Sequence, residues 1–581
     1  MKTVLALMAF LFLIGCSMEG ADLDATNDDT ASSSSDGSAS DDIAAATSLT
    51  LQEGTGLCSV DGSIQAATDG FLGDGYADTD NAYWNGVSWA FEVPTAGDYT
   101  VTWRYANADS GGQSASLLVN GSPVDTLTFT AGADGATWVE LSTTVTLSAG
   151  VNTVRLEAMT SDGLADIDSL TIDGSGLVAY PCGYGDSSSD TDSDAESGAS
   201  DSLPASTWYA CDDDSIVYDA EVVKSGDTWT VTDVSGIEVW SGSGMQTAIE
   251  EGLGVLDSGR TEKQSVVVRG DGTIDAASRV RLYSYTVLNV CGTIDVQGTP
   301  ATDMAPIWSR GTDHIDIPNV TITGTPAYGM FFRNVSDLHI GHAVFDLDTD
   351  SWEGVRIDNN PSAGGDRVTN VTIDAVAVSY SGGHGVETHG VDGLTIGTFV
   401  GDHTQSCGVL LNNTVNAEVG SITCNECAYV NTGYAAFRAA NSNGKIDDDW
   451  PAGNVHVGSV YARGGGRGIF SVSGSGGLTI DNIDLADNGN HAILLQNAYN
   501  TTIAAESGKV AGNRVLLGND YDNTVSGLYL PSYNVTLSNL SLTDGATIEE
   551  QDTYCDWEGS GDLNNRAVNI TGGTVDMCYS D

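Results

Sequence analysis

Four ionisable residues occur in two similar short segments of the chain. Arg356 and Asp358 lie in EGVRIDN, and Glu387 and His389 lie in HGVETHG, 31 residues further along. If these segments form equivalent strands of neighbouring coils, all four side chains point outward on one face. A guanidinium, two carboxylates and an imidazole on one rigid surface can neutralise charge and transfer protons. We therefore predict an active site here, with these four residues as catalytic groups.

Two reactions suit these side chains. β-Elimination of a uronide requires Ca²⁺ or an arginine to neutralise the sugar carboxylate, and a base to remove the C5 proton. That base would be His389 or an arginine without a counter-ion. Hydrolysis of a glycosidic bond requires two carboxyl groups, and Asp358 with Glu387 is the available pair. In a purely structural interpretation, the four residues form only a ladder of ion pairs across the strands. We favour elimination.

Five further residues are predicted to face the same region. Arg333 and His384 lie on or beside the strands of the four central residues. Tyr434, Arg438 and Arg467 belong to later strands. We expect Arg438 to be catalytic and the other four to bind substrate. The register of Arg438 stays open, because its strand can be aligned in two ways.

The elements that must position these residues are short strands rich in Val, Ile and Thr. A small residue followed by an apolar one recurs at intervals of 25, 31, 23, 60 and 24 residues, at Gly329, Gly354, Gly385, Gly408, Gly468 and Ala492. A repeat of strands and turns with this period predicts a parallel β-solenoid, in which each coil buries its apolar residues against the next. The segment 243–256 is the one predicted helix, capped by Ser243, and we expect it to cover the first coil.

A shorter unit, residues 49–183, also consists of strands and turns. Segments such as SWAFEV and GDYTVTWRY alternate apolar and polar residues, which predicts a β-sandwich. Residues 17–48 and 184–204 are rich in Ser, Asp and Gly, which predicts disordered linkers. The predicted chain is therefore all-β, with a sandwich, a linker and a solenoid over residues 205–581.

The smaller unit resembles a known family of sugar-binding domains. FEVPTAGDYTVTWRYAN, VTLSAGVNTVRLEA and ADIDSLTI look like carbohydrate-binding modules of families 6 and 35. The resemblance implies a jelly-roll sandwich with a structural Ca²⁺ held by Glu53 and Asp168. It also implies that Tyr76 and Trp138 stack on a sugar ring, since a pyranose has an apolar face.

The larger unit resembles right-handed parallel β-helices of the pectate-lyase superfamily, from about residue 240 to 545. Lyases, hydrolases, epimerases and phage tailspikes share this fold, so it does not determine the reaction. We expect an enzyme that degrades an acidic, uronic-acid-containing plant or algal polysaccharide by β-elimination. A hydrolase or an epimerase is the alternative enzyme, and a glycan-binding adhesin is the alternative without catalysis.

The N-terminal segment predicts export. A lysine precedes the apolar run Val4–Ile14, which is too short to span a bilayer and is typical of a signal peptide. Leu13-Ile14-Gly15-Cys16 resembles the lipobox of bacterial lipoproteins, which implies a signal peptide over residues 1–16 and lipidation of Cys16. We expect a monomer anchored by lipid to the outer membrane or cell surface.

The charge and the cysteines limit the remaining interpretations. The chain has 20 Lys and Arg against 80 Asp and Glu, a net charge of −60, which argues against nucleic acid as a partner. The two resemblances imply a polysaccharide as the partner instead. Ten cysteines predict disulfides in an exported protein. Without Cys16 nine remain, so at least one is unpaired. Cys424 and Cys427 are interpreted as structural thiols or as part of a disulfide with Cys407.

Overall fold

The computed structural model describes residues 48–52, 56–73, 75–79, 81, 85–108, 112–119, 122–132, 137–160, 162–179, 211, 216–360, 366–447, 449–451, 453–522, 528–551 and 563–578. Cys16, Glu53 and the predicted linker 184–204 lie outside these residues. The described strands form two units, which we call the sandwich unit (residues 48–179) and the stacked unit (residues 216–578). Among the described residues, no helix has the length and apolar character needed to cross a membrane.

The sandwich unit consists of two antiparallel sheets around an apolar core, as predicted. The first sheet contains, in spatial order, β3 (Gly62–Gln65), β4 (Tyr76–Thr79), β11 (Asp166–Asp173), β6 (Gly97–Ala106) and β9 (Val139–Leu147), with β1 (Ser48–Leu51) paired to β11. The second contains β12 (Val178–Ala179), β5 (Gly86–Val93), β10 (Gly150–Ala158), β7 (Gln113–Val119) and β8 (Ser122–Phe129), with β2 (Leu57–Val60) paired to β5. Trp89, Phe91, Trp103 and Phe129 are completely buried between the sheets.

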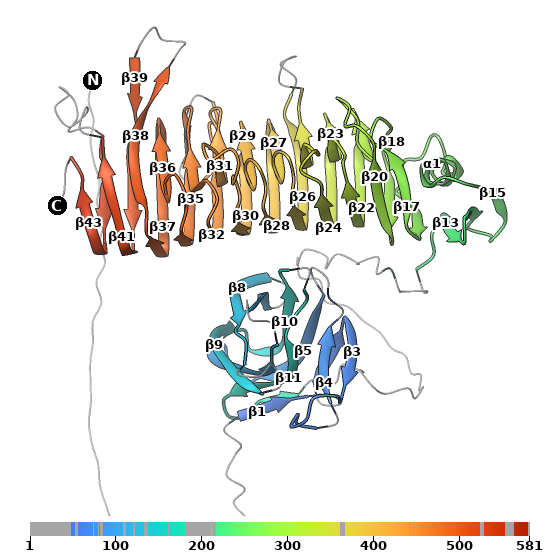
Figure 1. Ribbon diagram of the computed structural model, residues 1–581, viewed down its shortest axis with the longest axis horizontal. Helices are drawn as coiled ribbons and strands as arrows, with labels where there is room; N and C mark the ends of the chain where they lie inside the picture. Colours follow the sequence, from blue (N-terminus) through green and yellow to red (C-terminus); the bar gives the residue numbers. More distant parts are fainter. Residues whose placement is uncertain are drawn as a thin grey trace, which may run out of the picture. The chain divides into compact units, whose positions relative to one another are not determined.

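The stacked unit contains 31 strands in one continuous order, β13 to β43. Figure 1 shows these strands side by side, from β13 next to α1 to β43. The first twelve strands are β13 (Ala220–Ser225), β14 (Thr228–Asp233), β15 (Glu238–Gly242), β16 (Gln264–Arg269), β17 (Gly272–Asp275), β18 (Val280–Arg281), β19 (Thr286–Val290), β20 (Thr293–Gln297), β21 (Ile307–Arg310), β22 (Asp313–Gly324), β23 (Tyr328–Arg333) and β24 (Ser336–Leu347).

The later strands alternate between short and long segments. They are β25 (Glu353–Asp358), β26 (Val368–Ser379), β27 (Val386–His389), β28 (Val391–Asp402), β29 (Val409–Asn412), β30 (Val415–Asn425), β31 (Ala435–Ala440), β32 (Val455–Arg463), β33 (Arg467–Ser471), β34 (Ser475–Gly476), β35 (Leu478–Ala486), β36 (Ile493–Gln496), β37 (Ala498–Ala511), β38 (Arg514–Asp522), β39 (Leu528–Pro531), β40 (Tyr533–Ser538), β41 (Leu540–Glu550), β42 (Arg566–Val568) and β43 (Thr571–Asp576). From β16 onward, all the pairings are parallel except that of β38 with β39.

One row of short strands positions the predicted site. We call β18, β21, β23, β25, β27, β29, β31, β33, β36 and β38 the short-strand row, because each pairs in parallel with the next. One register position places a fully buried residue on nine successive strands: Ile307, Met330, Val355, Val386, Val409, Phe437, Ile469, Ile493 and Val515. This column explains the small-then-apolar repeat of the sequence, and the interval of 60 residues contains β31.

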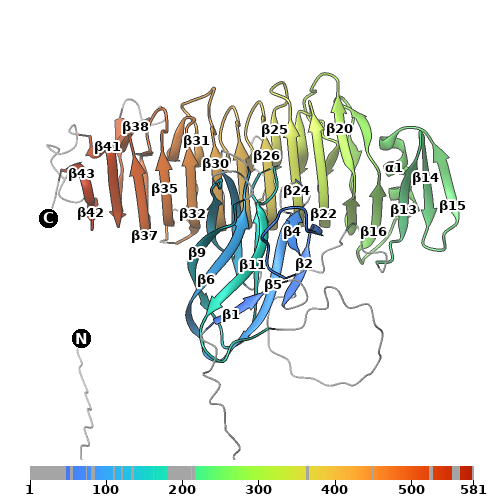
Figure 2. The ribbon, with the colours of Figure 1, turned by 60° about the horizontal axis from the view of Figure 1, so that its bottom comes forward.

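The predicted helix is α1 (Met245–Val255), at the start of the stacked unit. It packs against β13 and β14 and buries Met245 and Ile249 among other residues, so it covers apolar side chains of the first strands as expected. Figure 2 shows α1 beside these strands from a second direction. The predicted cap by Ser243 is wrong, because Gly244 occupies the N-cap position and no side chain caps the helix.

The disulfides differ from one of the predicted arrangements. Cys424 bonds to Cys427, and Cys211 bonds to Cys291. Cys407 is buried and is the free cysteine of the described part of the chain. A disulfide between Cys407 and the CxxC segment is therefore wrong.

Replacing Gly385 by alanine is expected to destabilise the stacked unit. A Cβ atom at this position would lie 2.6 Å from Cζ of Phe399 and 2.7 Å from the carbonyl oxygen of Gly408. Overpacking of this kind costs about 1–3 kcal/mol of the free energy of unfolding. The midpoint of urea-induced unfolding, followed by circular dichroism, should therefore fall.

Gly254→Ala is the matched control for this experiment. A Cβ atom at Gly254, an exposed residue of α1, meets no atom within 4 Å. Alanine is favoured over glycine inside a helix by about 0.5–1 kcal/mol. Equal urea midpoints for the two variants would contradict the close packing seen at Gly385.

Candidate functional site

The short-strand row carries two columns of outward side chains. The first aligns Phe331, Arg356, Glu387, Leu410, Arg438, Phe470 and Leu494. The second aligns Arg333, Asp358, His389 and Asn412. The pairing of Arg356 with Glu387 and of Asp358 with His389 is the predicted one. The alignment that the sequence left open is also resolved, because Arg438 lies between Leu410 and Phe470.

Arg356 lies at the centre of a cluster of carboxyl groups. Its Nη1 forms an ion pair with Glu387 and lies 3.5 Å from Oε1 of Glu353, and its Nε lies 3.2 Å from Oδ2 of Asp358. Arg333 donates two hydrogen bonds to Asp358, of 2.5 Å from Nε and 2.8 Å from Nη2. The side chains of Arg356 and Arg333 keep 18% and 25% of their surface exposed, whereas that of Asp358 has none.

Asp358 is therefore a residue that substrate cannot reach. Burial opposes its ionisation, but hydrogen bonds from Arg333 and from the N–H of Asn360, together with the charge of Arg356, lower its pKa. Asp358 thus holds the two guanidinium groups in place. The predicted hydrolytic pair of Asp358 and Glu387 lacks the accessible carboxyl group that it requires.

Glu353 is a member of this site that the sequence interpretation missed. Burial and the neighbouring Glu387 raise its pKa well above the usual value, despite the opposing charge of Arg356. Burial also raises the pKa of Glu387, which accepts a 2.7 Å hydrogen bond from Asn412. Two carboxyl groups in one desolvated site do not both ionise easily, so a proton is held more readily by Glu353 than by a solvent-exposed glutamate, while Glu387 forms an ion pair with Arg356. Glu353 pairs with Tyr328 of β23, and this strand register identifies it as a member of the site.

Two histidines flank the cluster in their neutral form. Burial and the charge of Arg356 lower the pKa of His389, whose Nδ1 has no hydrogen-bond partner among the described residues. Burial and the charges of Arg438 and Arg356 lower the pKa of His384 to about 3. Nδ1 of His384 accepts a hydrogen bond of 3.0 Å from the backbone N–H of Cys407. His389 is thus the neutral imidazole whose ring retains an unused nitrogen.

The remaining predicted residues lie along the same outer face. The ring of Tyr434 lies edge-on to His384, with centroids 5.2 Å apart. The guanidinium of Arg438 lies 4.9 Å from the ring centre of Tyr434 and 5.0 Å from that of Phe470. The guanidinium of Arg467 lies 4.3 Å from the ring centre of Phe470, a residue of the same strand. The structure thus brings together all the predicted site residues of the stacked unit in one continuous surface.

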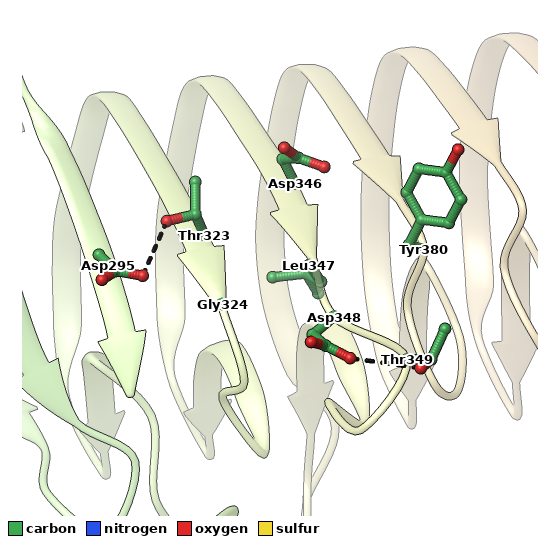
Figure 3. Close-up of a pocket in the computed structure, with 8 residues that line it drawn as sticks. All are labelled: Asp295, Thr323, Gly324, Asp346, Leu347, Asp348, Thr349 and Tyr380. Atoms are coloured by element: carbon green, nitrogen blue, oxygen red, sulfur yellow. Dashed lines mark hydrogen bonds between the residues drawn. The ribbon is translucent and has the colours of Figure 1, made fainter. Parts of the chain in front are cut away.

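A shallow acidic pocket occurs on a different row of strands. Figure 3 shows it between β20, β22 and β24, with a volume of about 420 Å³, lined by Asp295, Thr323, Gly324, Asp346, Leu347, Asp348, Thr349 and Tyr380. Asp295 accepts a hydrogen bond from Thr323. In the described part of the chain, no three side chains of His, Cys, Asp or Glu gather closely enough to hold a metal ion. The pocket therefore supports no metal site.

The calcium prediction for the sandwich unit finds only partial support in the described residues. Asp168 forms an ion pair with Arg104 and accepts a 2.8 Å hydrogen bond from the N–H of Leu72. A guanidinium competes with Ca²⁺ for the same carboxylate oxygens, so this arrangement does not fit a cation site. Glu53 lies outside the described residues, and the calcium site remains a prediction.

The predicted sugar-stacking residues of the sandwich unit differ in exposure. Only 4% of Tyr76 is exposed, and its ring packs edge-on against Trp138 with centroids 5.3 Å apart. The neighbouring rings cover most of Tyr76, and the stacking role predicted for it stays a prediction. Trp138 is partly exposed, donates a 3.0 Å hydrogen bond to the carbonyl of Asp69, and lies 5.0 Å from the guanidinium of Arg104.

Comparison with known proteins assigns the sandwich unit to a family. Residues 63–174 match the family described as carbohydrate binding module (family 6). Alpha-L-arabinofuranosidase C of Cellvibrio japonicus is 40% identical over 144 residues, which are 24% of this chain and 23% of the relative. Endo-1,4-beta-xylanase B of the same organism is 40% identical over 138 residues, 23% of each chain. The chain thus spans about a quarter of the length of these curated relatives.

Solved structures resemble the same share of the chain. A family 35 module from Cellvibrio japonicus Abf62 is 39% identical over 23% of this chain and 99% of its own, with a TM-score of 0.23. Xyl-CBM35, solved in complex with a disaccharide containing glucuronic acid, is 38% identical over the same shares, also with a TM-score of 0.23. The family match shows that residues 63–174 form a carbohydrate-binding module.

Glu353→Gln is expected to change how the stability of the protein depends on pH. Because the pKa of Glu353 is raised in the folded protein, its contribution to stability is complete below the usual glutamate pKa of about 4.3 and is lost as pH rises through the folded value. The amide carries no charge at any of these pH values. The thermal midpoint should therefore fall less between pH 5 and pH 8 in the variant than in the wild type.

Glu251→Gln provides the control, because Glu251 is an exposed residue of α1. Its thermal midpoint should follow that of the wild type at every pH. A Glu353→Gln variant that also follows the wild type would show that Glu353 ionises normally in the folded protein.

Proposed function

We propose that this protein is an exported, lipid-anchored enzyme that degrades an acidic polysaccharide, and that the stacked unit is a right-handed parallel β-helix carrying the reaction. The sandwich unit binds the glycan. The observation that supports catalysis is the buried pair of Glu353 and Glu387 around Arg356, next to the neutral His389. Shifted pKa values of a buried carboxyl group and of a neighbouring-strand histidine are typical of functional sites rather than of faces that serve only for solubility.

The charge balance of the cluster suits an anionic sugar. Arg333 and Arg356 each carry a positive charge, Asp358 and Glu387 each carry a negative one, and Glu353 is neutral. The net charge near zero does not repel a uronate, whereas the rest of this acidic protein would. The exposed parts of the two guanidinium groups can bind the sugar carboxylate.

In β-elimination, these residues would divide the proton transfers between them. His389 removes the proton from C5, the bond between C4 and the glycosidic oxygen breaks, and a double bond forms between C4 and C5. The proton of Glu353 passes to the departing oxygen, and the arginines stabilise the charge that develops on the carboxylate. Deprotonated His389 and protonated Glu353 are the required starting states, and the directions of their pKa shifts favour both.

Hydrolysis is the second candidate reaction, and one observation favours it. Glu353 and Glu387 are an acid and a carboxylate with different proton occupancy, as cleavage of a glycosidic bond by water requires. The named activities of the matching relatives, an arabinofuranosidase and a xylanase, also concern glycans. A glycan-binding adhesin without catalysis remains the alternative of another class.

Incubation of the full chain with pectic, alginate and glycosaminoglycan polymers distinguishes these functions. Elimination produces an unsaturated sugar that absorbs ultraviolet light together with a new reducing end. Hydrolysis produces new reducing ends without that absorbance. If neither product forms with any acidic polymer, the enzymatic proposal fails and the adhesin is favoured.

His389→Ala is expected to reduce elimination at least 100-fold, because general-base catalysis contributes about 10²–10⁴-fold. The rate of the wild type should also fall on both sides of an optimum. On the acid side the rate falls because His389 gains a proton, at a pH below the usual histidine pKa of about 6.5. On the alkaline side the rate falls because Glu353 loses its proton. Measuring the initial rate of absorbance change across pH gives both limbs of this pH–rate profile.

His456→Ala is the matched control, since His456 lies on β32 between Glu418 and Asp481, outside the short-strand row. This variant should keep the activity and pH profile of the wild type. Full activity of His389→Ala would eliminate His389 as the base.

A further inference from the structure

We propose that Arg438 and Arg467, with Phe470 between them, form a binding subsite for the acidic group of a sugar residue beyond the reacting one. The adjoining cleft on β33, β36 and β38 holds the continuation of the same polysaccharide chain. The inference builds on the proposed function, because it names where an anionic polymer lies relative to the cluster around Arg356.

Arg438 and Arg467 are positive charges without a counter-ion. Among the described residues, neither forms an ion pair, and Nε of each is buried without a hydrogen-bond partner. Arg333 and Arg356 on earlier strands of the same row are instead held by Asp358 and Glu387. In a chain with 80 acidic residues and 20 basic ones, two neighbouring arginines without an ion pair among the described residues form a place that suits an anionic group.

Both guanidinium groups lie beside the ring of Phe470. They lie 5.0 Å and 4.3 Å from the ring centre of Phe470, which is itself only 6% exposed. Burial and the charge of Arg438 lower the pKa of Arg467. A carboxylate or sulfate bound between them would relieve this repulsion and satisfy their free N–H donors.

A cleft continues the surface from Arg467 toward the C-terminal end of the stacked unit. Its volume is about 510 Å³, and it is lined by Arg467, His491, Leu494, Gln496, Arg514, Leu516, Asn519, Glu549, Glu550, Gln551 and Asp576. His491 is only 7% exposed, yet its Nε2 has no partner in the described structure. Burial and the charges of Arg514 and Arg467 lower its pKa to about 4, so it is neutral at pH 7.

The lining of this cleft suits a sugar better than a simple anion. Carboxyl and amide groups of Glu549, Gln496 and Gln551 can accept or donate hydrogen bonds to hydroxyl groups, whereas they would repel or ignore a phosphate. Leu494 and Leu516 offer an apolar floor to the C–H face of a sugar ring. The ligand is therefore an acidic glycan.

The register gives the direction of the bound polymer. Glu387, Leu410 and Arg438 occupy one column on consecutive strands, so Arg438 lies about 10 Å from Glu387 along the stack. Phe470, Leu494 and Leu516 continue the column into the cleft. A polysaccharide bound at both places crosses the strands and runs toward β38. This position, two strands away from the reacting groups, makes Arg438 a binding residue, where the sequence predicted a catalytic one.

Titration calorimetry of the full chain with a hexauronate tests the subsite. The probe is used with its natural carboxylates and, in a parallel titration, with every carboxyl group reduced to an alcohol. In the wild type we expect at least tenfold tighter binding of the charged form at one site. The double variant Arg438→Gln/Arg467→Gln should lose that site from the stoichiometry and leave any binding by the sandwich unit unchanged.

Arg463→Gln is the matched control, because Arg463 lies on β32 and is ion-paired with Asp484 at 2.9 Å. It should bind both forms of the hexauronate as the wild type does. The double Arg→Lys variant, which keeps both charges, should retain part of the preference for the charged form and guards against a folding defect. Unchanged stoichiometry in the double glutamine variant, or equal affinity for the two probes in the wild type, would overturn the subsite.

The outcome is independent of turnover. A protein that prefers the charged probe through Arg438 and Arg467 but cleaves no polymer would refute the proposed enzyme and retain the subsite. If the wild type cleaves an acidic polymer but the double glutamine variant binds the charged probe with unchanged affinity, the proposed enzyme is retained and the subsite is refuted.

Discussion

Parallel, in-register hydrogen bonding between successive short strands is the constraint on which the site depends. It places each outward side chain about 4.8 Å from its equivalent on the next strand. Arg356 therefore lies opposite Glu387, and Asp358 opposite His389. At this spacing each residue desolvates its neighbours, so that groups on the outer face of a sheet become nearly as buried as core residues. The raised pKa of Glu353 and the lowered pKa of His389 follow from that crowding.

The same constraint separates the outer face into two electrostatic regions. Around Arg356, cations and carboxyl groups alternate and nearly cancel one another. Around Arg438 and Arg467, apolar residues take the intervening positions, and these two arginines form no ion pair in the described part of the chain. Because the protein carries a net charge of −60, most of its surface is expected to repel a polyanion. In the proposed function, the row would guide the polymer as well as carry the reaction.

Much of this arrangement could be predicted from the sequence, because the inward column repeats a small residue followed by an apolar one. The segment AAFRAA around Arg438 was ambiguous, since either Ala435 or Ala436 could begin the repeat. The burial of Phe437 selects Ala436 as the equivalent of Gly408. Glu353 was missed because it precedes the repeat, at a corner where the alternation of inward and outward residues does not hold.

Burial of a single ring or carboxylate is harder to predict than register. Tyr76 has the position of a sugar-stacking residue, but neighbouring rings cover it, and no local pattern signals that contact. Asp358 likewise has a catalytic residue type and spacing, yet two arginines enclose it. In each case one covering neighbour, Trp138 or Arg333, comes from a distant segment of the chain.

Joining a carbohydrate-binding module to this site has a physical consequence for weak binding. The module and the stacked unit belong to one chain, so a polysaccharide bound by the module meets the stacked unit in an intramolecular step. One polysaccharide held by the module is then present near the stacked unit at an effective concentration in the millimolar range. A subsite built from two arginines and an apolar floor needs only modest affinity under these conditions. Modest affinity would also let a cleaved chain leave. Binding shared between the two units would therefore favour turnover on a polymer over tight binding of a short fragment.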